Sequence, residues 1–323
     1  MNHHPVHSQI IDSLKKTPDY ISGEEISHVL KISRAAVWKY VEDLRQLGYD
    51  IVAVPHLGYR LMSCPDKLFP QEIQYHLGTN LLGKKIVYHE TIDSTMDAAF
   101  DLARGGAPEG TVVCAETQTQ GRGRLGRLWV SPKGKGIYTS LILRPKISPL
   151  EVARLIFLSA VAVSWAIKTV TGLTSLIKWP NDLMVKNKKL AGILTELSTD
   201  IDQVKFVVIG IGVNVNTSVS SLPAHTTSLK QETKHEQPRV ALFQEMLREL
   251  EKRYLGLIRE GFDPLLKEWK QLSTTLNRRV RVVDSSGFVD GQAVDIDRDG
   301  GLLIRQDSGI VVKKLAGDVV EVR

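Results

Sequence analysis

Apolar residues in the first 64 positions recur at the spacing of short amphipathic helices. Residues 10–14 predict a first short helix. Ser22, with Glu25 three positions later, has the pattern of a capping box and predicts a second helix that runs through Leu30. After a two-residue turn, Ser33 is placed to cap a third helix. The chain therefore begins with three closely spaced helices.

The third helix is predicted to end at Gly48, a residue type favoured just past a helix C-terminus. One face of it is apolar, and comprises Val37, Tyr40, Val41, Leu44 and Leu47. Residues 51–61, interrupted by Pro55 and Gly58, then predict a β-hairpin. Three helices followed by a hairpin indicate a winged helix-turn-helix domain over residues 1–64, and the sequence around Cys64-Pro65-Asp66 is a candidate linker.

Residues 65–272 mix both periodicities and predict an α+β domain with a mixed, mainly antiparallel sheet. The expected strands cover residues 85–90, 112–116, 137–143, 176–179, 183–185, 189–198 and 204–215. The expected helices cover 95–104, 149–171, 238–261 and 262–272. From 273 to 323, short alternating segments separated by glycine-containing turns predict a small SH3-like β-barrel.

One stretch between two predicted strands is unusual in charge. Residues 116–131 alternate glycines with arginines, and from Thr117 to Leu150 there are seven Lys or Arg and no Asp or Glu. Glycine lets the backbone approach a ligand, and arginine donors match carboxylate and phosphate groups. A solvated loop or a nucleic-acid-binding tail would share this composition. The flanking strands favour a binding loop on a rigid scaffold, and the glycine spacing fits no nucleotide fingerprint.

Composition narrows the class of protein further. The net charge of +6 is modest, and the two cysteines, Cys64 and Cys114, predict a reducing compartment with no disulfide framework. Cys114 is expected to be a buried strand residue. The longest uncharged apolar run, residues 155–167, is too short to cross a bilayer and predicts a buried helix. With no secretory signal at the N-terminus, we expect a soluble cytoplasmic protein and no membrane partner.

Four motifs in order resemble the biotin–protein ligase family. They are Q-G-R-G-R-L-G-R-L-W-V-S-P at 120–132, K-W-P-N-D at 178–182, K-K-L-A-G-I-L at 188–194 and G-I-G-V-N-V-N at 210–216. With the N-terminal helix-turn-helix, the resemblance extends to the bifunctional biotin ligases that also repress biotin genes, and it covers essentially the whole chain.

The resemblance implies a set of site residues. Those expected to bind biotin and the adenylate are Ser94, Thr95, Met96, Gln118, Arg122, Gly123, Arg124, Arg127, Trp129, Asn181, Lys189, Gly192, Gly210 and Gly212. Those expected to act in catalysis are Lys189, Arg122, Arg124 and Asp182, the last orienting or deprotonating the acceptor lysine. Met96 departs from the polar residue more usual in the family. Considered alone, Asp182 could be a turn residue, the 188–189 pair a solvated hairpin tip, and Trp129 a core residue.

The N-terminal domain supplies a second candidate site. A recognition helix contacts bases with its N-terminal residues, so Arg34, Trp38 and Lys39 are the expected DNA contacts, with Arg60 on the wing. Residues 1–64 contain as many acidic as basic side chains, seven of each. A helical bundle that docks another protein is therefore the alternative, although S-R-A-A-V-W-K at 33–39 resembles the family's recognition helix.

The expected function is ATP-dependent. The enzyme would form biotinyl-5′-AMP from biotin and ATP, with Mg²⁺ accompanying the triphosphate. It would then transfer biotin to a lysine of the biotin carboxyl carrier domain of acetyl-CoA carboxylase or another biotin-dependent carboxylase. The adenylate would favour a homodimer that binds operator DNA. A lipoate–protein ligase and a non-catalytic, ligand-sensing transcriptional regulator are the alternatives.

Overall fold

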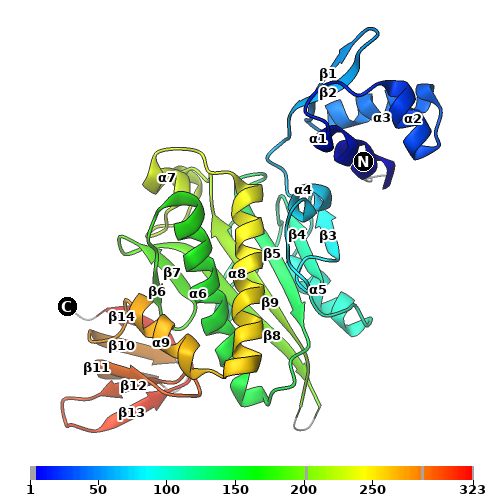
Figure 1. Ribbon diagram of the computed structural model, residues 1–323. Coiled ribbons are helices and arrows are strands. Elements are labelled where there is room, and N and C mark those ends of the chain that lie inside the picture. Colours follow the sequence, from blue (N-terminus) through cyan, green and yellow to red (C-terminus); the bar gives the residue numbers. More distant parts are fainter. Residues whose placement is uncertain (1–4, 201–202, 285–286, 322–323) are drawn as a thin grey trace. The chain divides into compact units, whose positions relative to one another are not determined.

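The computed structural model describes residues 5–200, 203–284 and 287–321 (Figure 1). Contacts divide the chain into two compact units, Met1–Asp66 and Lys67–Arg323. The division falls at the candidate linker, where Pro65 interrupts regular structure.

The first unit contains three helices and a two-stranded antiparallel hairpin. These are α1 (Pro5–Lys16), α2 (Gly23–Leu30), α3 (Arg34–Gln46), β1 (Asp50–Val54) and β2 (Gly58–Ser63). Ser22 Oγ accepts from the Glu25 amide at 3.0 Å, and Ser33 Oγ accepts from the Ala36 amide at 3.1 Å, so both predicted caps are confirmed. The winged helix-turn-helix prediction is therefore correct.

The apolar face of α3 forms the centre of this unit. Val37, Val41 and Leu44 have no exposed surface, and Ile10 and Ile26 of the two preceding helices, which contact α3, are equally buried. Sequence analysis did not foresee that Arg45 would tie α3 to the wing. Its Nε and NH2 both donate to the Ile51 carbonyl, at 2.8 and 2.6 Å.

The second unit is built on a seven-stranded sheet with the order β3-β4-β5-β9-β8-β7-β6. Its strands are β3 (Ile86–His89), β4 (Val112–Ala115), β5 (Gly136–Leu143), β6 (Leu176–Lys178), β7 (Asp182–Val185), β8 (Lys188–Thr199) and β9 (Val204–Asn214). The β3–β4 pair is parallel and the other pairs are antiparallel. The predicted mixed, mainly antiparallel sheet is confirmed.

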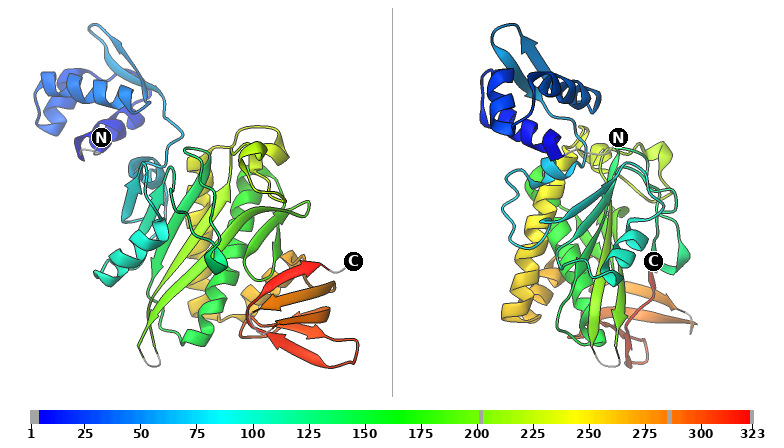
Figure 2. Two further views of the ribbon diagram at one scale, coloured as in Figure 1. Left: turned by 180° about the vertical axis from the view of Figure 1, so that it is seen from behind. Right: turned by 90° about the vertical axis from the view of Figure 1, so that its right-hand side faces the viewer.

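Helices cover both faces of this sheet (Figure 2). On one face α6 (Ala153–Thr171) and α8 (Arg239–Glu260) join the large hydrophobic core. On the other face α5 (Thr95–Arg104) contributes Met96, Ala99 and Ala103 to a smaller cluster. The remaining helices are α4 (Pro70–Gln74), α7 (Leu229–Thr233) and α9 (Asp263–Leu272). The two shortest were not predicted, because five residues are too few to show a helical period.

The segment Pro149–Thr171 is the one described helical stretch that is long and apolar enough to cross a bilayer. Its first turn, Pro149–Val152, is a 3₁₀-helix, and α6 follows. Leu155, Phe157 and Leu158 are at most 1% exposed and lie within the large core. The apolar character of this segment is thus explained by burial inside the protein, as predicted.

The C-terminal strands form a separate five-stranded antiparallel sheet with the order β13-β12-β11-β10-β14. They are β10 (Arg279–Asp284), β11 (Gly287–Ile296), β12 (Leu302–Arg305), β13 (Val311–Lys314) and β14 (Asp318–Glu321). Among the described residues β13 and β14 remain edge strands, so the predicted small barrel is not closed. Trp179 Nε1 donates to the Gly300 carbonyl at 3.0 Å and ties this sheet to the seven-stranded sheet.

Candidate functional site

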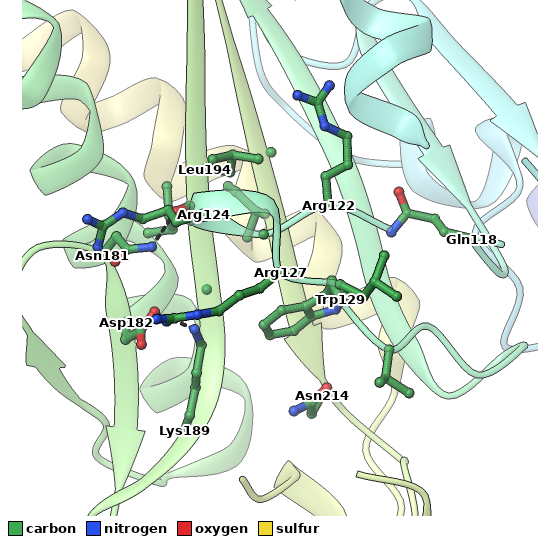
Figure 3. A pocket seen from close by; sticks show the side chains of 18 of the residues that line it. Gln118, Arg122, Arg124, Arg127, Trp129, Asn181, Asp182, Lys189, Leu194 and Asn214 are labelled. Carbon is green, nitrogen blue, oxygen red and sulfur yellow. Dashed lines mark hydrogen bonds and ion pairs between the residues drawn. The ribbon is translucent and has the colours of Figure 1, made fainter. Parts of the chain in front are cut away.

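A cavity of about 350 Å³ lies beneath the glycine–arginine loop, between the start of α5 and strands β7, β8 and β9 (Figure 3). The predicted residues that line it are Thr95, Met96, Gln118, Arg122, Gly123, Arg124, Arg127, Trp129, Asn181, Asp182, Lys189, Gly192, Gly210 and Gly212. Ser94 does not line it. That buried hydroxyl caps α5 by accepting from the Asp97 amide at 3.4 Å.

Polar side chains form one end of the cavity. Gln118 Oε1 accepts from both the amide and the hydroxyl of Thr95, at 2.9 and 3.0 Å. Ser140 donates to the same Thr95 hydroxyl at 2.9 Å, and Gln118 Nε2 donates to Ser131 Oγ at 3.0 Å. These bonds fix the orientation of Gln118 across the loop. The first turn of α5 is thereby joined to the loop at both of its ends.

Two glycines face each other in the floor of the cavity, where Gly192 of β8 pairs with Gly212 of β9. The Trp129 ring lies on them. A Cβ atom at Gly212 would be 2.5 Å from Trp129 Cε2, and one at Gly192 would be 3.0 Å from Cζ3. A Cβ at Gly210 would similarly meet Met96 Sδ at 2.5 Å. In this structure the glycines therefore make room for Trp129 and Met96, where sequence analysis had expected them to admit a ligand directly.

Lys189 lies opposite Asp182 in the cavity. Its Nζ is 2.6 Å from Asp182 Oδ1 and 5.6 Å from the Trp129 ring centroid. The neighbouring Lys188 is exposed and does not line the cavity. Between β7 and β8 the register shifts, so that Leu183 pairs with Ala191 and the next residue pairs with Lys189. This bulge changes the phase of β8 and lets Lys189 and Gly192, three residues apart, line the same cavity.

The loop cations are paired with carboxylates from distant parts of the chain. Arg122 contacts Asp97 and Glu196, and Arg127 contacts Asp318. Arg124 donates to Asn181 Oδ1 at 2.9 Å and to the Gly317 carbonyl at 3.1 Å. The local absence of acidic residues thus does not produce uncompensated positive charge. Tertiary structure supplies the carboxylates.

Two polar atoms in the cavity were not foreseen. Asn214 is 2% exposed, and its Nδ2 donates to the Thr227 carbonyl at 3.1 Å, but its Oδ1 has no hydrogen-bond partner. Trp129 Nε1 is also buried without an acceptor. Unsatisfied buried polar atoms are uncommon in folded proteins. Asn214 is part of the last quoted motif, G-I-G-V-N-V-N, so its position in that motif was the available signal.

A second unforeseen wall of the cavity consists of Leu222, Pro223 and Thr226. It is held against β8 because the Lys189 amide donates to the His225 carbonyl at 2.9 Å. Nearby, burial alone would raise the pKa of Glu232, but hydrogen bonds from Thr227 and Lys186 outweigh it and lower that pKa. This segment has no regular periodicity, so its position beside the cavity could not be predicted from the sequence.

The root of the glycine–arginine loop is anchored in the core. Glu116 directly follows β4, is 2% exposed, and accepts from the Leu68 amide and from Arg239 NH1, each at 2.8 Å. Arg239, the first residue of α8, is equally buried. Cys114, two residues before Glu116, is fully buried, and burial raises the pKa of its thiol far above the usual range. It is therefore the unreactive strand residue that was predicted.

Similar proteins place this architecture in a family. The bifunctional ligase/repressor BirA of Bacillus subtilis is 41% identical over 296 residues, which cover 90% of this chain and 91% of that protein. BirA of Escherichia coli is 31% identical and covers 93% of this chain and 92% of its own length. The chain belongs to the bifunctional biotin ligase/repressor family.

Three family models match parts of this ligase/repressor. They are the biotin/lipoate A/B protein ligase family at residues 88–214, an HTH domain at 6–60, and the biotin protein ligase C-terminal domain at 275–320. A biotin protein ligase from Aquifex aeolicus, solved in complex with biotin and ATP, is 28% identical with a TM-score of 0.64. The similarity covers 74% of this chain and 99% of the Aquifex aeolicus chain.

The predicted DNA-contact residues in the HTH unit of this ligase/repressor differ in how exposed they are. Arg34, Trp38 and Lys39 are exposed on α3, Trp38 with 60% of its surface. Arg34 and Trp38 line a concave surface between α3 and the wing. Arg60 is half-buried, with its guanidinium 5.8 Å from the Tyr20 ring centroid. Arg60 therefore also has a packing role.

Proposed function

We propose that this protein condenses biotin with ATP to biotinyl-5′-AMP and then transfers biotin to a lysine of a carboxylase carrier domain. The observation that carries the proposal is that one continuous cavity contains both of its chemical ends. It joins a polar end at Thr95 and Gln118 to a cationic end at Lys189, Arg124 and Arg127. A ligand with a small polar head, an apolar middle and an anionic end matches this arrangement.

The chemistry requires an attack of one anion on another. The biotin carboxylate oxygen attacks the α-phosphorus of ATP, the bond to the bridging oxygen breaks, and pyrophosphate leaves. Fixed cations lower this barrier because they stabilise charge that builds up in the transition state. Lys189, held opposite Asp182 at 2.6 Å, is placed to act on the carboxylate or the phosphate. In the second step the acceptor amine attacks the acyl carbon and AMP leaves, with Asp182 orienting that amine or accepting its proton.

The cavity residues take the following roles in this proposal. Thr95 and Gln118 bind the ureido group of biotin, and Ser94 supports them as the α5 cap. Met96 and Gly210 form the apolar floor, and Trp129 on Gly192 and Gly212 packs against adenine. Asn214 Oδ1 accepts a hydrogen bond from the ligand. Gly123, Arg124 and Arg127 cover the phosphates, and Asn181 holds Arg124 in place.

Magnesium ion would enter with the triphosphate. Among the described residues no cluster of three His, Cys, Asp or Glu side chains could hold a metal. Two carboxylates, Asp182 and Asp318, nevertheless line the cavity. Mg²⁺ is usually held by one or two carboxylates together with substrate phosphates, so this donor set fits an ion brought by ATP.

The three-part organisation, residues 1–64, 65–272 and 273–323, separates DNA reading from ligation. We place the protein in the cytoplasm, where its carrier domains and its operator are found. In the proposed repressor the adenylate favours a homodimer that binds a palindromic operator through Arg34, Trp38, Lys39 and Arg60. Arg34→Ala in the full chain should weaken specific operator binding by about 1–3 kcal/mol and leave adenylation intact. Unchanged operator affinity in that variant would refute the recognition-helix assignment.

The ligase activity is tested by incubating the protein with ATP and labelled biotin and detecting the adenylate by mass. Lipoate in competition distinguishes the second candidate enzyme, since a biotin ligase should form no lipoyl adenylate under the same conditions. A protein that binds biotin but forms no adenylate would be a sensor without catalysis. Formation of a lipoyl adenylate, or binding of biotin without formation of an adenylate, would overturn the proposal.

A further inference from the structure

Arg122 is held differently from the other two arginines of its loop. Its NH1 pairs with Asp97 and its NH2 with Glu196, so each arm of the guanidinium has its own carboxylate. Arg124 and Arg127 instead contact the 317–318 segment of the C-terminal sheet. In Figure 3 the Arg122 side chain points away from Asp182 and Lys189. The loop is therefore attached to α5 and β8 through Arg122, and to the C-terminal sheet through Arg124 and Arg127.

The two carboxylates that hold Arg122 belong to opposite walls of the cavity. Asp97 follows Thr95 and Met96 in the first turn of α5, and both of those residues line the cavity. Glu196 follows Leu194, a lining residue of β8. Because Arg122 bridges the two walls, it holds the loop across the end of the cavity at which Thr95 and Gln118 lie.

The charges of this cluster argue against a direct phosphate contact by Arg122. One guanidinium between two carboxylates has a formal net charge of −1, which repels an anionic ligand. An arginine guanidinium binds carboxylates with well-defined geometry, so these two ion pairs fix the direction of the Arg122 side chain. Arg122 is 41% exposed and Asp97 is 55% exposed, which makes each pair individually weak and sensitive to salt.

We propose that Asp97 and Glu196 are positioning residues that use Arg122 to hold the loop closed over the biotin end of the cavity. They touch no reacting atom. Their effect is to slow the escape of biotin and of the bound adenylate, whereas the phosphate chemistry at Lys189 proceeds without them. This inference rests on the proposed function, since it concerns retention of the adenylate.

The experiment compares Asp97→Asn, Glu196→Gln and the double variant in the full-length protein. Asp101→Asn is the matched control, because Asp101 lies one turn further along α5, is exposed, and has no ion pair among the described residues. Each single variant should raise the rate of biotinyl-adenylate release and the KM for biotin about threefold, and the double variant about tenfold. The turnover number of adenylate formation and the thermal unfolding temperature should change little, and the control should match the wild type.

Salt supplies a readout that a purely structural role would not give. Adenylate release from the wild-type protein should accelerate with added KCl, because half-exposed pairs are screened. In the double variant this acceleration should be largely lost. Asp97→Glu, which keeps the charge, should retain most of the wild-type behaviour.

Two results would overturn the proposal that Asp97 and Glu196 hold the loop closed through Arg122. One is a double variant that releases the adenylate at the wild-type rate with the wild-type salt dependence. The other is Arg122→Met abolishing adenylate formation while the carboxylate variants do nothing, since Arg122 would then contact the phosphate. If the wild-type protein itself forms no adenylate, the proposed function fails, and this outcome is distinct from both.

Discussion

Replacing Lys189 by alanine tests the catalytic end of the cavity most directly. The Lys189 ammonium lies 2.6 Å from Asp182 and 5.6 Å from the Trp129 ring centroid, and the side chain is 31% exposed. The substitution removes a cation from the place where negative charge builds up during attack on the α-phosphate. It leaves the backbone bonds of β8, which hold the cavity wall, unchanged.

The expected magnitude follows from the loss of one preorganised donor. Such a loss typically costs about 3–4 kcal/mol in the barrier, and each 1.36 kcal/mol corresponds to about tenfold in rate. The partial exposure of Lys189 favours the lower end, so we expect about a 100-fold slower adenylation. Asp182 loses its partner in the same variant, and the Asp182→Asn/Lys189→Ala double variant separates the two effects.

The assay is single-turnover formation of biotinyl-5′-AMP, followed by quenching. Lys188→Ala is the matched control, because Lys188 is adjacent, carries the same charge and does not line the cavity. It should react at nearly the wild-type rate. Equal losses in the two alanine variants, or a larger loss from Lys188→Ala, would refute the assignment of Lys189.

Three further outcomes are expected. Gly212→Ala should displace the Trp129 ring, 2.5 Å from the added Cβ, and raise the KM for ATP at least about tenfold, whereas Gly256→Ala, in open space on α8, should not. Glu116→Gln should lower the free energy of unfolding by about 3–5 kcal/mol in urea titrations, since it removes the carboxylate charge that Arg239 NH1 meets at 2.8 Å inside the core. Because the pKa of Glu232 is lowered from 4.5, its ionised form stabilises the fold above that pH, and this stability is lost on acidification; Glu232→Gln should flatten that part of the stability–pH curve.

The elements that the sequence predicted well are those with local causes. Ser22 and Ser33 cap helices through hydroxyls three residues from their partners, and β5 and β9, which are buried along almost their whole length, were predicted from their apolar sequence without tertiary information. The short α4 and α7 were missed because their five residues are fixed by contacts with the rest of the fold. The open edges of the C-terminal sheet likewise depend on which strands pair, and alternation within one strand does not decide that.

The candidate site was predictable as a set of residues and less so as an arrangement. The family resemblance identified the lining residues from Thr95 to Gly212, but a resemblance does not show what each side chain contacts. The carboxylates that neutralise the loop arginines come from Asp97, Glu196 and Asp318, which are far from the loop in sequence. Charge counted along residues 117–150 therefore overstated the positive field that a ligand would meet. Local composition describes the unfolded chain, whereas the field in the cavity depends on the folded one.

The anchoring of Glu116 decides how much of the loop can move. The pair with Arg239 joins residues 123 positions apart, and both side chains are 2% exposed. Breaking a buried pair of this kind is costly, so the end of β4 stays fixed while the loop beyond it changes position. From Gly121 onward Arg122 and Arg127 are held by partly exposed ion pairs with Asp97, Glu196 and Asp318, and Arg124 by hydrogen bonds to Asn181 and Gly317. A rigid root and more weakly held arginines together confine the motion to the segment that covers the ligand, so we expect ligand exchange to break these arginine contacts and to leave the Glu116–Arg239 pair intact.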